Sequence, residues 1–135
     1  MTEGNEQEIS LYEGLGGEAG VRALVREFYR LMDTLPETQG IRAMHPDLAV
    51  SEEKLFAFLS GWTGGPQLYI EKYGHPRLRM RHFPFPIGGS ERDQWMLCMD
   101  RALAASALQD PYRSLMSRAL YRLADHMRNK PQENS

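Results

Sequence analysis

The chain has 135 residues, of which 41% are hydrophobic and 25% are charged, and its formal net charge is −2 with histidine counted as neutral. A chain of this length and composition is expected to form one globular domain with a buried core. The near-neutral charge argues against general affinity for nucleic acids or membranes. The single cysteine, Cys98, excludes an internal disulfide and favours a reducing compartment, so we expect a cytoplasmic protein.

The two ends of the chain are polar. Residues 1–8 lack the basic start and apolar core of a signal peptide. No apolar run approaches the roughly 18 residues of a membrane-spanning helix. We therefore expect residues 1–10 and 130–135 to be flexible and residues 11–129 to form the domain.

The first half of the domain has the periodicity of helices. Residues 18–33 are predicted to form a long helix, and a short helical turn over 38–44 is broken by Pro46. The next helix is predicted over 51–63, with Ser51 as the N-cap residue. The apolar faces of the two long helices comprise Val21, Leu24, Val25, Phe28, Tyr29 and Met32 in the first, and Leu55, Phe58, Leu59 and Trp62 in the second.

A proline- and glycine-rich passage over 64–90 follows, with short helical turns expected at 67–73 and 76–82. A long irregular segment inside a compact domain is usually functional or disordered, and the aromatic content of this one argues against disorder. A capping box of Ser90 and Asp93 is predicted at its end.

Two long helices are predicted after this passage, over 91–108 and 111–129. Asp110 is expected to cap the second of them, with Pro111 in its first turn. Its predicted buried residues are Leu115, Met116, Ala119, Leu120, Leu123 and Met127. No alternating strand pattern of useful length occurs, so the predicted fold class is all-α.

Four histidines are the candidate metal ligands, and none forms a multi-ligand pattern with cysteine or acidic residues. The sequence is still compatible with a metal site that has one protein ligand, such as the site of haem iron. His82 is the best candidate, because Pro84 and Pro86 force the helix to end beside it. The alternative is a histidine that interacts with the helix dipole. For His75, His126 and His45, taken alone, we favour roles in loops, helix ends and capping.

Several motifs match a known family in order and spacing over residues 12–128. They are Gly14-Leu15-Gly16-Gly17, Phe28-Tyr29, Trp62-Thr63-Gly64-Gly65-Pro66, the run from Tyr73 to His82 (YGHPRLRMRH), Phe85-Pro86-Ile87 and Glu91-Arg92-Asp93-Gln94-Trp95. With these motifs the chain resembles a group II truncated haemoglobin. The resemblance implies a two-over-two helical sandwich around haem b (iron protoporphyrin IX), with residues 18–33 and 51–63 on the distal side.

The resemblance also assigns roles to single residues. His82 becomes the proximal iron ligand, and Tyr29 and Trp95 become distal hydrogen-bond donors. His45 falls beside the distal pocket, and Ser51 stands where larger globins often carry a distal histidine. The expected propionate contacts are Arg79, Arg81 and Tyr73, and the expected haem-packing residues are Leu55, Phe58, Leu59, Trp62, Phe85, Ile87 and Met99.

Three distal donors, from Tyr29, Trp95 and His45, predict slow release of dioxygen, which suits chemistry better than transport. The favoured function is redox detoxification, either nitric oxide dioxygenation or peroxide reduction, supported by an unidentified electron donor. One alternative is oxygen binding, storage or scavenging without turnover, and another is a helical interaction module without haem. We expect small ligands as partners, no nucleic acid or membrane, and a monomer or homodimer.

Overall fold

The structure, a computed structural model, describes residues 9–130, and within that range it contains helices and no strand. The all-α prediction is therefore confirmed for this part of the chain. The elements in chain order are α2 (Leu11–Leu15), α3 (Gly17–Thr34), the 3-10 helix η1 (Pro36–Thr38), α4 (Gln39–Ala43), α5 (Leu48–Trp62), α6 (Leu68–Tyr73), α7 (Leu78–His82), α8 (Gly89–Ala104) and α9 (Tyr112–His126).

The short helix α2 was not predicted, because five residues are too few for a periodic pattern. Its start is fixed by a capping box in which the Ser10 hydroxyl accepts from the backbone N–H of Glu13 at 3.1 Å. The Glu13 carboxylate accepts in return from the Ser10 backbone N–H at 3.3 Å. The left-handed φ angles of Gly16 (109°) and Gly17 (70°) then turn the chain into α3.

Helix α5 begins three residues earlier than predicted, so the assignment of Ser51 as its N-cap is wrong. Asp47 is the N-cap, and its carboxylate accepts from the backbone N–H of Val50 at 3.2 Å. Asp47 directly follows Pro46, where the chain is already extended, and the side chain can cap the first possible turn. Ser51 therefore lies inside the helix.

Helix α8 also begins earlier, and the predicted capping box of Ser90 and Asp93 is wrong. The Glu91 carboxylate accepts from the backbone N–H of Gly88 at 2.7 Å, while the Ser90 hydroxyl accepts from the Gln94 side chain at 3.0 Å. The helix ends at Ala104 rather than at 108. The Ser106 hydroxyl donates to the Leu103 carbonyl and accepts from the Leu108 N–H. These bonds replace those that a further helical turn would form.

Helix α9 begins at Tyr112 with Pro111 as its N-cap, so the predicted cap at Asp110 is wrong by one residue. The Asp110 carboxylate, just before the N-cap, still accepts from the backbone N–H of Ser114 at 3.0 Å. The buried face of α9 contains Met116 and Leu120, one turn apart. Leu115 was expected in the core but is 50% exposed, because it lies about 100° around the helix from Met116.

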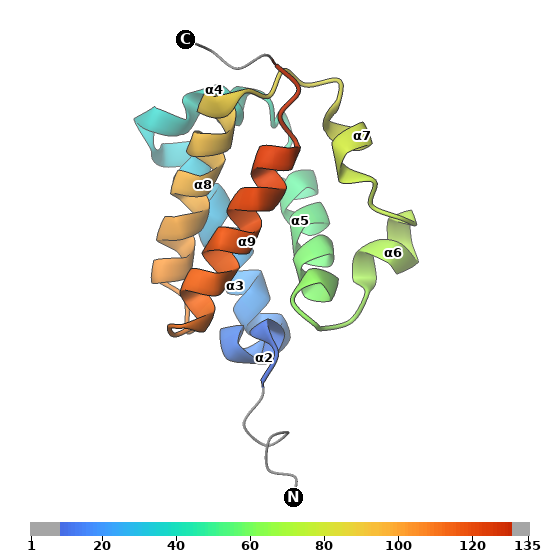
Figure 1. The fold of residues 1–135 in the computed structure, drawn as a ribbon, viewed down its shortest axis with the longest axis vertical. Coiled ribbons are helices and arrows are strands. Elements are labelled where there is room, and N and C mark those ends of the chain that lie inside the picture. Colours follow the sequence, from blue (N-terminus) through green and yellow to red (C-terminus); the bar gives the residue numbers. More distant parts are fainter. Residues whose placement is uncertain (1–8, 131–135) are drawn as a thin grey trace, which may run out of the picture.

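The core lies where α3 packs against both α8 and α5, and where α8 packs against α9. Figure 1 shows α8 and α9 side by side, with α6 and α7 together at the edge of the molecule. The fully buried large side chains are Phe28, Leu15, Leu24, Met32, Leu59, Met99, Leu103, Leu108, Met116, Leu120, Val21 and Val25. Of the helices between residues 9 and 130, none has the length and apolarity that a membrane crossing requires.

Candidate functional site

His82 is the last residue of α7, and its imidazole is fixed by the helix itself. The ring Nδ1 lies 2.7 Å from the backbone carbonyl oxygen of Leu78, one turn earlier. A carbonyl oxygen can only accept, so Nδ1 carries the proton and Nε2 keeps its lone pair. This is the arrangement in which a neutral histidine ligates a metal, with the second ring nitrogen setting the orientation.

The chain beyond His82 is attached to the end of α9. The Asn129 side-chain amide donates to the Phe85 carbonyl at 2.8 Å and accepts from the backbone N–H of Ile87 at 2.9 Å. The Ile87 carbonyl in turn accepts from the backbone N–H groups of Asn129 and Lys130. Asn129 was missed in the sequence, because the final helix was predicted to run to residue 129, whereas α9 ends at His126.

Tyr29 comes from α3 and is 7% exposed. Its hydroxyl has no hydrogen-bond partner within residues 9–130, yet every fully buried side-chain N or O atom in that range has one. The hydroxyl must therefore open on a space wide enough for a water molecule. Burial raises the pKa of Tyr29 well above its usual value of 10.0, so the hydroxyl keeps its proton and can donate.

His45 lies beside Tyr29, with 5.9 Å between the ring centroids. Its Nδ1 is 2.7 Å from the Ile41 carbonyl, so Nδ1 is again the protonated nitrogen. Burial lowers the pKa of His45 below 6.5, and the positive charges of His82 and Arg42 act in the same direction. Near neutral pH the Nε2 atom is consequently an acceptor, and the expected donor role of His45 requires its protonated form.

Trp95 lies in the second turn of α8 and is half-buried. Its ring contacts Phe28 at a centroid distance of 5.1 Å, and Phe28 contacts Tyr29 at 4.8 Å. Over the residues that the structure describes, the indole N–H also has no hydrogen-bond partner. Phe28 thus separates two unpaired donors and holds both rings, a role that the sequence did not reveal.

The predicted haem-packing residues differ in exposure and fall into three groups. Leu59 and Met99 are fully buried in the core, and Ile87 is 9% exposed. The half-buried ones, which pack against the core with one side, are Leu55, Phe58 and Trp62 of α5. Phe85, beyond α7, is 41% exposed. The half-buried side chains of α5 form an incomplete apolar wall, while contacts of all seven with haem stay a prediction.

The three predicted propionate contacts are engaged with their own surroundings. Arg79 donates from Nη1 to the carbonyls of His126 and Arg128, both at 2.8 Å. Arg81 donates to the carbonyls of Pro76, His75 and Tyr73. The Tyr73 ring stacks on Tyr69 with 4.8 Å between centroids. Each guanidinium retains free N–H groups, so propionate binding stays a prediction.

These features together fit a haem group. His82 offers one oriented nitrogen, and Tyr29 and Trp95 offer unpaired donors, while α5 supplies half-buried apolar side chains. No group of three His, Cys, Asp or Glu residues capable of holding a metal ion occurs within residues 9–130. The site therefore suits a metal that brings its other ligands with it, as haem iron does.

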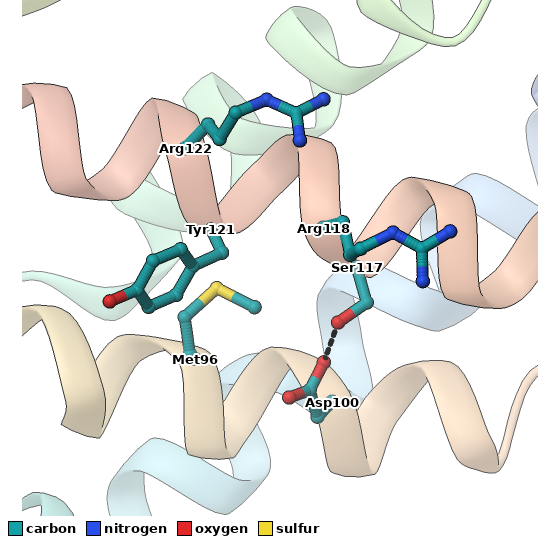
Figure 2. A pocket seen from close by; sticks show the side chains of 6 residues that line it. All are labelled: Met96, Asp100, Ser117, Arg118, Tyr121 and Arg122. Atoms are coloured by element: carbon teal, nitrogen blue, oxygen red, sulfur yellow. Dashed lines mark hydrogen bonds between the residues drawn. The ribbon is translucent and has the colours of Figure 1, made fainter.

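Two surface hollows lie apart from these residues. One of about 320 Å³ lies between α8 and α9, where Ser117 donates to Asp100 at 2.6 Å and the side chains of Arg118 and Arg122 extend away from Met96 (Figure 2). The other, of about 530 Å³, lies at the start of α8. Neither is lined by a residue predicted for the site.

Comparison with known proteins identifies the family of this chain. Residues 10–129 match the model of the family described as bacterial-like globin. The group 2 truncated haemoglobin YjbI of Bacillus subtilis (strain 168) is 37% identical over 119 residues, which are 88% of each chain.

Solved structures are also similar to this chain. The group II 2-on-2 haemoglobin of Agrobacterium tumefaciens is 49% identical, with a TM-score of 0.88 over 98% of this chain and 100% of that one. The cold-adapted truncated haemoglobin of Pseudoalteromonas haloplanktis TAC125 is 42% identical, with a TM-score of 0.87 over 91% of this chain and 100% of that one. The resemblance read from the motifs is confirmed, and the chain belongs to the bacterial-like globin family with the truncated 2-on-2 fold.

Proposed function

We propose that this globin holds haem b through Nε2 of His82 and uses Tyr29 and Trp95 to retain a small ligand for redox detoxification, by nitric oxide dioxygenation or peroxide reduction. Haem-based binding of diatomic ligands such as dioxygen follows from its family. The observation that carries the proposal is the 2.7 Å contact between His82 Nδ1 and the Leu78 carbonyl, which leaves Nε2 as the ligating atom.

A non-covalently held haem is supported by the cysteine content. Cys98 is the only cysteine of the chain, and its side chain is fully buried in the core between the helices. Burial also raises the pKa of its thiol, which keeps it protonated and unreactive. Thioether attachment needs an accessible cysteine, so iron protoporphyrin IX held by His82 and apolar contacts is the favoured cofactor.

The bound haem supplies the iron and its redox chemistry. This chain's own residues supply donors on the distal side. The Tyr29 hydroxyl and the Trp95 indole N–H are neutral and have no partner among residues 9–130, so they favour a ligand that carries partial negative charge. Near neutral pH the Nε2 atom of His45 is an acceptor, so His45 is not counted among these donors. Retention of the ligand favours chemistry over transport, and this supports detoxification over storage.

The haem assignment is tested with His82→Gly, which removes the proposed ligand. We expect the purified variant to lose the Soret band of the wild-type protein and to recover it when imidazole is added. His75→Gly, in an exposed loop, is the matched control and should keep the band. A variant at position 82 that retains a wild-type spectrum without imidazole would refute the assignment.

The detoxification chemistry is tested by turnover. Purified ferrous protein is supplied with nitric oxide, with and without dioxygen, and ferric protein with hydrogen peroxide. Excess ascorbate returns the electrons that each cycle consumes, and products are followed over many cycles. Sustained consumption supports the proposal, whereas binding without turnover selects oxygen storage or scavenging. We further propose a cytoplasmic protein that acts as a monomer or homodimer and receives electrons from a separate donor.

A further inference from the structure

The surface around α7 is basic, although the chain as a whole is slightly acidic. Residues 72–90 contain four Lys and Arg residues and no Asp or Glu, whereas the whole chain carries 16 Lys and Arg against 18 Asp and Glu. We use the name proximal patch for the exposed side chains of Arg77, Met80, Arg81 and Phe83. Figure 1 shows α7 at the edge of the molecule, where a large partner can reach it.

The centre of the proximal patch is apolar. Met80 is 59% exposed, and Phe83 at 68% is the most exposed large apolar side chain in the described part of the chain. At about 100° per residue, Met80 lies on the opposite side of α7 from His82, and Phe83 lies next to Met80. A cofactor held by His82 therefore leaves Met80 uncovered. Exposed apolar pairs with a polar rim are typical of interaction sites.

The rim of the proximal patch carries charges that no residue between 9 and 130 neutralises. Arg81 is held by the carbonyls of Pro76, His75 and Tyr73, which bear no charge. Neither Arg77 nor Arg81 forms an ion pair with a residue between 9 and 130. The rim is thus positively charged and surrounds an apolar centre. The electric field of such a rim steers an acidic partner toward the patch.

We propose that the proximal patch docks a small acidic electron-transfer protein that carries a flavin or an iron–sulfur cluster. The proposal rests on the redox function proposed above, which requires a donor that loses one electron for each electron the globin gains. Docking at Met80 and Phe83 places this donor directly behind the helix that carries His82. Weak, rapidly exchanging redox complexes use small interfaces of this kind.

A second copy of this chain fits the proximal patch less well. In a two-fold symmetric dimer the same patch meets itself, so Arg77 and Arg81 of both copies would face like charges. An acidic partner has no such repulsion. Self-association and binding to an anionic membrane are nevertheless outcomes that the experiment distinguishes.

The first experiment maps binding without electron transfer. Haem-loaded globin labelled with ¹³C at the methionine methyl groups, in its diamagnetic ferrous carbonyl form, is titrated with oxidised acidic flavodoxin and, separately, with oxidised plant-type ferredoxin. We expect the Met80 signal to move while those of the buried Met32, Met99 and Met116 do not. The shift should vanish near 1 M salt, where the screening length is about 3 Å.

Variants then test the proximal patch. Arg77→Glu and Phe83→Glu should each weaken flavodoxin binding at least about tenfold. Arg122→Glu and Leu115→Glu, exposed on α9, introduce the same charge changes elsewhere and should bind as wild type does. Equal weakening by the patch and control variants would show a general charge effect and overturn the proposal.

Two further outcomes would also overturn it. They are binding of phosphatidylserine vesicles but neither redox protein, and a concentration-dependent dimer in sedimentation that Phe83→Glu abolishes. The proposed function is judged separately, with ascorbate as reductant. Normal flavodoxin binding by Arg77→Glu and Phe83→Glu, together with intact ascorbate-driven turnover, overturns only the docking surface. Loss of flavodoxin binding in those variants, together with no turnover by the wild-type protein with either ascorbate or reduced flavodoxin, overturns only the detoxification function.

Discussion

His45 is the residue whose role the structure changes most. Its position beside Tyr29 agrees with the family motif, but a sequence shows no tautomer. The contact with the Ile41 carbonyl fixes Nδ1 as the protonated nitrogen, and burial keeps the ring neutral near neutral pH. The closeness of His45 to Tyr29 was thus predictable. The protonated nitrogen of His45 was not, because it depends on a backbone carbonyl one turn away.

The lowered pKa of His45 predicts an acid-dependent ligand release. As pH falls through a value below 6.5, Nε2 gains a proton and becomes a third donor. The dissociation of dioxygen should therefore slow on acidification, as measured by stopped-flow absorbance. His45→Ala should remove this dependence, and His75→Ala, in the exposed loop, should leave it unchanged. Faster release at acid pH in the wild type would contradict the assigned tautomer.

The folding stability should depend on pH in the same range. Because the folded state lowers the pKa of His45, the unfolded chain binds its proton more readily. The stabilisation from a neutral His45 is present above pH 6.5 and is lost as the pH falls. Urea unfolding from pH 5 to 8 should show a smaller loss at low pH for His45→Ala than for the wild type.

The distal donors make a third prediction at this scale. Tyr29→Phe and Trp95→Phe each remove one unpaired donor and keep an aromatic ring beside Phe28. A hydrogen bond to a charged acceptor contributes about 1.5–3 kcal/mol, so each variant should release dioxygen roughly ten- to a hundredfold faster. Tyr69→Phe, a buried tyrosine outside α3, is the control. Wild-type rates in both distal variants would remove the basis of the proposed retention.

At the scale of elements, long helices were predictable and their ends were not. The apolar spacing of residues 18–33 identified α3 almost to its bounds, because a periodic face needs only sequence. The start of α5 was missed because Asp47 and Ser51 are both good caps, and only the extended chain at Pro46 selects between them. The attachment of α7 was invisible because Arg79 and Asn129 bond to backbone carbonyls, which no sequence pattern marks.

Asn129 gives the test of that attachment. Asn129→Ala removes the hydrogen bonds to the Phe85 carbonyl and the Ile87 N–H, and we expect a loss of about 1–3 kcal/mol in the free energy of unfolding. Because the same bonds fix the segment after His82, haem should also pass faster to apomyoglobin. Asn129→Asp keeps the acceptor oxygen. Its free energy of unfolding and its rate of haem transfer should therefore lie between those of the wild type and Asn129→Ala. Gln109→Ala, exposed elsewhere, should change neither quantity.

At the scale of the whole molecule, the helices of the packed core differ from α7, which lies at the edge. The packing of α3, α8 and α9 forms the core, while α7 is held mainly by side-chain bonds from Arg79 and Asn129. The family and its fold were predictable from motifs spread over the chain, since each constrains the same cofactor site. The proximal patch was not predictable, because the exposure of Met80 and Phe83 requires the packed structure.

This division predicts how haem removal affects the chain. If haem occupies the proposed site, its removal takes an apolar neighbour from the half-buried side chains of α5 and the bond to iron from His82 of α7. Hydrogen–deuterium exchange should accelerate first over residues 64–90, while α3, α8 and α9 stay protected. Mass spectrometry of the two forms measures this. Uniform loss of protection across the domain would show that α3, α8 and α9 do not fold without the cofactor.

The bonds that join the end of α9 to Ile87 limit where the chain can be shortened or extended. Residues 128–130 follow the last helix, yet they hold the segments on both sides of His82. The carbonyl of Arg128 accepts from Arg79, the amide of Asn129 donates to the Phe85 carbonyl, and the backbone N–H of Lys130 donates to the Ile87 carbonyl. A protein that stops at residue 127 loses all three and should release haem readily. Fusion partners and purification tags are therefore best joined beyond residue 130, where they leave these groups in place.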